Sequence, residues 1–292
     1  MFEVITPELR EQIAESLAID IDQWSCESLN DGHRKHLGAS LIGKPCSREL
    51  WYTFRWAKKA TFSESDKDNN GRLFRLFDRG HREEPAMIRF LEGIGCKFKY
   101  TKEQQARISD CGGHFGGSLD NIGTLPERYG ITQDILFEFK TSAFSEFNKL
   151  VKDRVKKHKP AHWAQMCAYG YKAHLHYGLY MCANKNNDEL HLELLQLDHD
   201  FGKMMVERAH SIITSQIAPP KISMTPTNFS CKWCSFKDIC HYGAPVEKNC
   251  RSCANAVPID GGKWSCALYG EIPDEVIPQG CDQHTPLVNI TI

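Results

Sequence analysis

The stretch "ILFEFKTS" at residues 135–142 decides the fold, because it is strongly apolar and too short for a helix. Successive side chains of an extended strand point to opposite faces, so Phe137 and Phe139 share one face while Glu138 and Lys140 share the other. A carboxylate and an ammonium therefore lie side by side on a strand that otherwise looks buried. A solvated ion pair near a sheet edge would also explain these charges, since such pairs are common.

Length and composition indicate a folded protein of one large domain or two. The chain has 292 residues, of which 41% are hydrophobic and 25% charged, and it has no run of 18 apolar residues. The start, "MFEVITPELREQIAES", is amphipathic and acidic, so we expect no secretion, no membrane span and a cytoplasmic location, in the host cytoplasm if the protein is viral. The net charge of −1 means that contact with nucleic acid must come from local patches.

Cysteine content is the strongest compositional signal. The chain has 13 cysteines and no signal peptide, and cysteines that cluster in a reducing compartment are typical of metal or cluster ligands. Seven of them fall between residues 231 and 281.

Hydrophobic periodicity predicts an α/β core with a mixed central sheet flanked by helices. The chain then changes composition near residue 225, and a small cysteine-rich, metal-binding appendage follows. The predicted helices cover residues 7–24, a segment from about 46, a segment from 72 that is interrupted near Gly80 to Pro85, and residues 160–175 and 199–215; the predicted strands cover 97–100, 115–122 and 134–141, with a hairpin of 177–184 and 190–197.

Acidic residues and a lysine recur at a spacing that suits phosphodiester cleavage. "GGSLD" ends in Asp120, and Glu138 and Lys140 follow about twenty residues later on the next strand. Two carboxylates can hold Mg²⁺ through oxygen ligands, and the ion lowers the pKa of a bound water. A lysine two residues from the glutamate reaches the same water, which gives a reason for the spacing.

These motifs resemble the PD-(D/E)XK nuclease superfamily, in the branch of RecB-type, CRISPR-associated RecB-like and viral alkaline exonucleases. "RGHREEPA" is similar to the helical Gly-x-x-x-Glu motif, with Gly80 and Glu84 in its place, although RecB-type members carry a histidine where Glu84 stands. "PAHWAQMCAYGY" is similar to the helix that carries Gln165 and Tyr169. The resemblance covers about residues 36–240 and implies a restriction-endonuclease-like core. It departs from the family in Leu119, which replaces the usual proline.

The resemblance also implies roles for these residues. Asp120, Glu138 and Glu84 would bind Mg²⁺ or Mn²⁺ with the Phe139 carbonyl as a further ligand, and Lys140 would orient the attacking water. Gln165 and Tyr169 would support the site. Two alternatives stay open: Glu83 could take the place of Glu84, and Gln165 and Tyr169, one helical turn apart, could simply pack.

Three cysteines form a C-x2-C-x5-C set, "CKWCSFKDIC", which needs a fourth ligand. The resemblance supplies Cys46 in "PCSRELWY", and implies a [4Fe–4S] cluster that joins the two ends of a nuclease domain spanning residues 1–240. Such a link would close a loop of 231 − 46 = 185 residues. The cluster ligands would be Cys46, Cys231, Cys234 and Cys240.

The tail, residues 241–292, contains a second set that suits a structural Zn²⁺, because a segment this short could not build its own core without one. Its ligands would be Cys250, Cys253, Cys266 and Cys281, with His284 as a spare. A zinc ribbon made of Cys231 and Cys234 with Cys250 and Cys253 is an alternative. The remaining cysteines, which are expected to be small buried residues, are Cys26, Cys96, Cys111, Cys167 and Cys182.

The sequence therefore predicts a Mg²⁺- or Mn²⁺-dependent deoxyribonuclease. The basic run "NKLVKDRVKKHK" at residues 148–159 could contact DNA phosphates, or be an ordinary solvated face. By resemblance we expect an exonuclease of viral or mobile-element recombination, paired with a single-strand annealing protein. The alternatives are an endonuclease, a CRISPR-adaptation-type end trimmer, or an inactive DNA-binding module.

Overall fold

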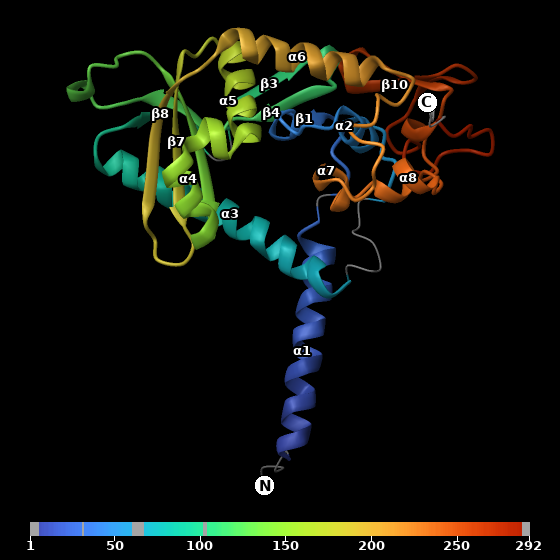
Figure 1. Cartoon of the computed structure of the whole chain (residues 1–292), viewed down its shortest axis with the longest axis horizontal. Helices are drawn as coiled ribbons and strands as arrows, with labels where there is room; N and C mark the ends of the chain where they lie inside the picture. Colours follow the sequence, from blue (N-terminus) through green and yellow to red (C-terminus); the bar gives the residue numbers. More distant parts are fainter. Residues whose placement is uncertain (1–5, 31, 60–66, 102–103, 288–292) are drawn as a thin grey trace. The chain divides into compact units, whose positions relative to one another are not determined.

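The computed structural model describes residues 6–30, 32–59, 67–101 and 104–287 (Figure 1). The chain forms two compact units, one made of residues 1–33 and 59–86, the other of residues 34–58 and 87–292. None of the described helices is long and apolar enough to cross a membrane.

The first unit holds α1 (Pro7–Ser28) and the first part of α3 (Lys67–Gly93). Thr6 caps α1 by accepting a hydrogen bond from the amide of Leu9, and Arg75 of α3 pairs with Asp22 of α1 at 2.5 Å. The predicted interruption near Gly80 to Pro85 in the helix from residue 72 is wrong, because α3 continues through Pro85. A proline removes only its own amide donor, and both Pro85 and His81, whose carbonyl loses that donor, are exposed to water.

The main sheet of the second unit has five strands in the order β2-β5-β6-β7-β8. β6 and β7 are parallel and the other pairs are antiparallel, so the central sheet is mixed, as predicted. α4 (Phe144–His158) and α5 (Pro160–Ala173) make the crossover between the two parallel strands, which places Glu138 opposite Tyr180. The strands are β2 (Lys97–Phe98), β5 (Asn121–Thr124), β6 (Ile135–Ser142), β7 (Tyr177–Asn184) and β8 (Leu190–Gln196).

The two faces of β6 enter different cores, as the alternation of its side chains predicted. Phe137 and Phe139 pack in a cluster with Met87 and Leu91 from the end of α3. Leu136 faces the larger core, which α4, α5 and α6 (His199–Thr214) build on the opposite face of the sheet. Glu138 and Lys140 therefore project to the side of the sheet that the helices cover.

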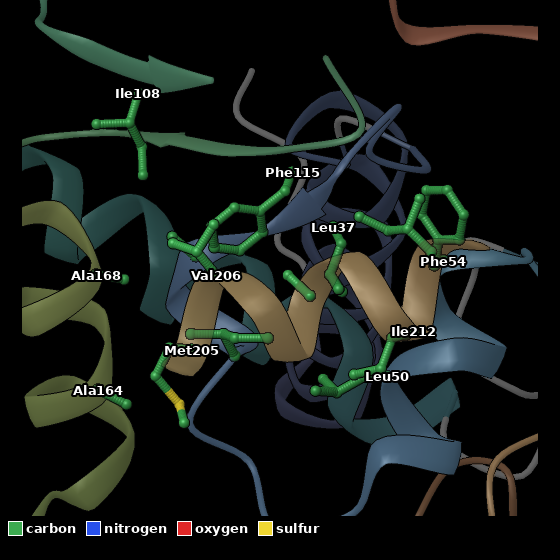
Figure 2. Packing of buried hydrophobic residues seen from close by; sticks show 14 of the residues in the cluster. Leu37, Leu50, Phe54, Ile108, Phe115, Ala164, Ala168, Met205, Val206 and Ile212 are labelled. Atoms are coloured by element: carbon green, nitrogen blue, oxygen red, sulfur yellow. The ribbon is translucent and has the colours of Figure 1, made fainter. Parts of the chain in front are cut away.

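Small residues let two of these helices approach closely. Figure 2 shows Ala164 and Ala168 of α5 facing Met205 and Val206 of α6, with Phe115 next to Val206. All five side chains are at most 9% exposed. Burial of this kind is the main stabilising contribution to such a core.

The predicted strand over residues 115–122 is in fact two strands in different sheets. β4 (Phe115–Ser118) pairs with β1 (Leu37–Gly38) and β3 (Arg107–Asp110), whereas β5 belongs to the main sheet. The change of sheet occurs at Leu119 and Asp120, and Leu119 is buried, at 1% exposure. Asp120 therefore lies at the point where the chain passes from one sheet to the other.

The tail is part of the second unit and forms a third sheet in the order β11-β10-β9. Its strands are β9 (Ala256–Ile259), β10 (Lys263–Cys266) and β11 (Gly270–Ile272). The remaining α-helices are α2 (Ser47–Phe54), α7 (Phe229–Lys232) and α8 (Lys237–Tyr242), and the short 3-10 helices are η1 (Ala39–Leu41), η4 (Cys111–Gly113), η5 (Glu127–Tyr129), η6 (Cys250–Ser252) and η7 (Asp260–Gly262).

Candidate functional site

Asp120 is fixed against β6 by a backbone hydrogen bond. The amide of Phe139 donates to Asp120 Oδ2 at 2.7 Å. The Asp120 side chain is 17% exposed, so it can still meet solvent or a ligand. The turn between the two sheets thus places the Asp120 carboxylate next to Phe139, in the middle of β6.

Lys140 joins the two predicted carboxylates. Its ammonium donates to Glu138 Oε1 and to the Phe139 carbonyl, the latter at 3.1 Å, and lies 3.9 Å from Asp120 Oδ2. The structure therefore brings Asp120, Glu138 and Lys140 together, within one small volume at the centre of the sheet. The Phe139 carbonyl, predicted as a metal ligand, accepts a hydrogen bond from Lys140 here.

Glu138 is an unusual carboxylate because it is fully buried. Its exposure is 0%, and its Oε2 has no hydrogen-bond partner among the described residues. Burial raises the pKa of Glu138, the Lys140 ammonium works against that change, and the Asp120 charge adds to it. Burial opposes the charged form of Lys140, but the two carboxylates outweigh it and raise the pKa of that lysine.

Helix α5 covers the face of β6 that carries Glu138 and Lys140. Gln165, 5% exposed, lies near the Glu138 side chain and lowers its pKa, against the larger effect of burial. Tyr169 donates from Oη to the carbonyl of Ser118 at 3.0 Å, and burial, followed by the Glu138 charge, raises its pKa. Both side chains lie near the Glu138 carboxylate.

Gly117 explains why the "GGSLD" motif carries a glycine next to its serine. A Cβ at Gly117 would lie 2.4 Å from Tyr169 Oη and 3.3 Å from two of its ring carbons. Because residue 117 has no side chain, the Tyr169 hydroxyl can reach the carbonyl of Ser118.

The site contains two further residues, Tyr180 and His162, that the sequence did not single out as functional. Tyr180 pairs with Glu138 across the parallel strands, and its hydroxyl lies 2.9 Å from His162 Nδ1. Burial, helped by the Lys140 charge, lowers the pKa of His162 to about 3, so its ring is neutral at physiological pH. The alternation of "YGLYM" could indicate a buried Tyr180, but its position opposite Glu138 depends on tertiary register.

The donor set at this centre suits a hard divalent ion. Asp120 and Glu138 provide carboxylate oxygens, and the unpartnered buried Oε2 of Glu138 is an atom that a cation would satisfy. Across the described ranges, no three His, Cys, Asp or Glu side chains are arranged so that they could hold a metal ion. The third predicted ligand, Glu84, belongs to the other compact unit, so its role stays a prediction.

The two cysteine sets line two separate cavities. One cavity, of about 20 Å³, is lined by Cys46, Cys231, Cys234 and Cys240, although 185 residues separate the first two. Burial raises the pKa of Cys231, and the nearby thiols of Cys46 and Cys240 add to the effect. The other cavity, of about 220 Å³, is lined by Cys250, Cys253, Cys266, Cys281 and His284.

The basic run of residues 148–159 forms most of α4, which had not been predicted as a helix. Carboxylates of α4 neutralise part of its charge: Lys149 and Lys159 pair with Glu146, and Lys157 pairs with Asp153. The remaining cations of this run, which form no ion pair with a described carboxylate, are Lys152, Arg154 and Lys156.

Comparison with models of known protein families finds no match, and comparison with curated proteins finds none. Similar solved structures include SSO0001, with 15% identity over 77% of this chain and 96% of that one, at a TM-score of 0.44. They also include the alkaline exonuclease LHK-Exo of Laribacter hongkongensis. Its complex with dAMP has 14% identity over 65% of this chain and 90% of that one, at a TM-score of 0.42. A second structure of it has 14% identity over 62% and 87%, at 0.40.

Proposed function

We propose that the protein is a divalent-metal-dependent deoxyribonuclease whose centre is formed by Asp120, Glu138 and Lys140. The observation that carries the proposal is the fully buried Glu138 carboxylate, with one oxygen unpartnered among the described residues and a lysine shared with Asp120. A buried acid at such a site is costly for folding, so a function is the better explanation for it.

Asp120 and Glu138 would hold Mg²⁺ or Mn²⁺. A bound ion would supply Lewis acidity, which would polarise the phosphate and lower the pKa of a water. Lys140, whose ammonium the two carboxylates keep charged, orients the attacking water and stabilises negative charge that develops on the phosphate. Gln165 holds the Glu138 carboxylate in position, and Tyr169 anchors the α5 helix to the strand that precedes Asp120.

The proposed substrate is DNA and the proposed mode is digestion from an end, in recombination or processing of viral or mobile-element DNA. The test incubates the protein with end-labelled linear DNA and with closed circular DNA, each with and without Mn²⁺. Loss of the linear substrate alone supports an exonuclease, and nicked circles indicate an endonuclease. Binding without loss of either substrate contradicts hydrolysis. Asp120→Asn is the matched inactive control, because it keeps the amide contact with Phe139 but loses the charge.

We also propose a [4Fe–4S] cluster at Cys46, Cys231, Cys234 and Cys240. Its support is that Cys46, at the start of α2, lines the same cavity as three cysteines that follow 185 or more residues later. The cavity of about 20 Å³ would have to widen to accept a cluster. Protein purified without oxygen should be brown, with a visible absorption band that Cys46→Ala removes. Colourless protein with zinc in this set would overturn the cluster.

A further inference from the structure

Two arginines lie buried in an aromatic box where the tail meets the rest of the second unit. Arg55 is 0% exposed and Arg251 is 1% exposed. The Arg251 guanidinium carbon lies 4.4 Å from the ring centre of Phe54, 4.4 Å from that of Trp56 and 4.8 Å from that of Trp264. Phe54 and Trp56 belong to the α2 region, whereas Arg251 and Trp264 belong to the tail, so this box fastens one to the other.

The hydrogen bonds of these arginines go to backbone carbonyls. Arg55 donates to the carbonyls of Ala256 at 3.1 Å and Ser215 at 2.9 Å, and Arg251 donates to that of Lys35 at 3.2 Å. Among the described residues neither guanidinium pairs with a carboxylate, and Arg55 Nε, Arg251 Nε and Arg251 Nη2 have no hydrogen-bond partner. Two buried positive charges thus lie close together without a counter-charge, which is costly in a protein interior.

Arg251 is part of the cysteine knuckle "CRSC", directly between Cys250 and Cys253. These two thiols line the cavity of about 220 Å³ together with Cys266 and Cys281. The backbone amide of Thr285 donates to Cys253 Sγ at 3.4 Å. His284, which also lines the cavity, has its Nε2 3.0 Å from Ser252 Oγ, so the four sulfurs are the better ligand set.

We propose that this cavity binds a structural Zn²⁺ through Cys250, Cys253, Cys266 and Cys281, and that the ion locks Arg251 into the aromatic box. Zinc with four thiolates carries a net charge of two minus, and two of the proposed ligands, Cys250 and Cys253, flank Arg251 and Ser252 in the sequence. Since these thiols are not arranged as ligands in the structure, binding draws them inward. That movement fixes the backbone of η6 and so the direction of the Arg251 side chain.

Other contacts show that the box is one part of a larger tail attachment. Asn249 donates from Nδ2 to the Trp56 carbonyl at 2.9 Å, and His114 Nε2 lies 2.8 Å from the Ile259 carbonyl. A Cβ at Gly113 would lie 2.8 Å from the amide nitrogen of Gly262, so the two loops touch closely. Loss of the ion should therefore loosen the whole attachment and expose Trp56 and Trp264, rather than unfold the tail alone.

The test measures zinc per chain by elemental analysis in the full-length protein and in Cys266→Ser and Cys281→Ser. We expect each variant to hold one equivalent less than the unmodified chain. Cys26→Ser, which replaces a half-buried cysteine of α1 outside both sets, is the matched control and should hold the full amount. Cys281→His should keep the metal, since imidazole is a zinc ligand, and so separates loss of a ligand from loss of folding.

The lock itself is tested with Arg251→Met, which keeps the cysteines but removes the charge and the stacking. We expect this variant to retain zinc and to lose about 5 °C or more of its melting temperature. Chelation of the unmodified chain should give a similar loss, with a red shift of tryptophan emission that added Zn²⁺ reverses. Unchanged zinc content in Cys266→Ser and Cys281→Ser would overturn the site. Metal loss without any change in melting or emission would overturn the lock. Neither readout depends on nuclease activity.

Discussion

Replacing Gly117 with alanine tests the geometry that connects α5 to the strand before Asp120. The new Cβ would lie 2.4 Å from Tyr169 Oη, about 1 Å closer than ordinary contact, and Tyr169 is 2% exposed, so it has no room to withdraw. The φ of Gly117 lies outside the left-handed region, so the backbone accepts alanine and the clash is the whole effect.

The expected cost is about 2–4 kcal/mol. Overpacking of a filled site costs about 1–3 kcal/mol, and loss of the hydrogen bond from Tyr169 to the Ser118 carbonyl costs about 1 kcal/mol more. Urea unfolding followed by circular dichroism, read as the shift of the midpoint at constant slope, gives the change in free energy.

Tyr169→Phe removes the atom that clashes and makes a double-mutant cycle possible. By itself it should cost about 1 kcal/mol, for the lost hydrogen bond. In that background Gly117→Ala should cost at least 1 kcal/mol less than in the unmodified chain, since only the ring contacts at 3.3 Å remain. Equal costs in both backgrounds would refute the close approach.

Three further predictions concern charge. Glu138→Gln should reduce nuclease activity about 100-fold or more, yet stabilise the metal-free protein at pH 8 by about 1–3 kcal/mol, because burial raises the pKa of Glu138 and each unit is worth about 1.4 kcal/mol. This gain should shrink as pH falls below the folded pKa toward the unfolded value of 4.5, since the native acid then takes up its proton first; a gain that grows in acid contradicts it. Burial lowers the pKa of His162 to about 3, so the neutral ring contributes stability above pH 6.5 that is lost as pH falls toward 3. His162→Gln should therefore make the melting temperature fall less steeply in acid. An unchanged acid profile in thermal melts contradicts this prediction. Replacing Lys152, Arg154 and Lys156 with alanine should reduce the slope of log binding constant against log salt concentration by about 0.9 per lost phosphate contact. Replacing the ion-paired Lys149 and Lys157 should change this slope less. Equal slopes in the variant and the unmodified chain would mean that this face is only solvated and does not contact DNA.

The sequence was most informative where local pattern and chemistry agree. Alternation in "ILFEFKTS" was enough to place Phe137 and Glu138 on opposite faces, because a strand has a fixed period of two. The pairing of Asp120 with that strand followed from motif order, and the structure supplies the hydrogen bond from Phe139 that holds it.

Features that depend on tertiary context could not be predicted. The sequence did not predict α4, because its many basic residues obscured the apolar positions Phe147, Leu150 and Val155, which are buried. The backbone of α4 is also irregular at Arg154, whose φ is 65°. The change of sheet at Leu119 leaves no local signal, so residues 115–122 looked like one strand. Tyr180 was missed because the register of a parallel pair is set by packing across a long connection.

The parallel pairing of β6 with β7 has a consequence for protein synthesis. Glu138 and its neighbour Tyr180 are separated by 180 − 138 = 42 residues, and the α4–α5 crossover must form before the strands can pair. When β6 has just left the ribosome, the nascent chain contains Asp120, Glu138 and Lys140 but does not yet contain α4, α5 and β7, which pack against β6. The carboxylates and the lysine can therefore reach their observed arrangement only after β7 has been synthesised.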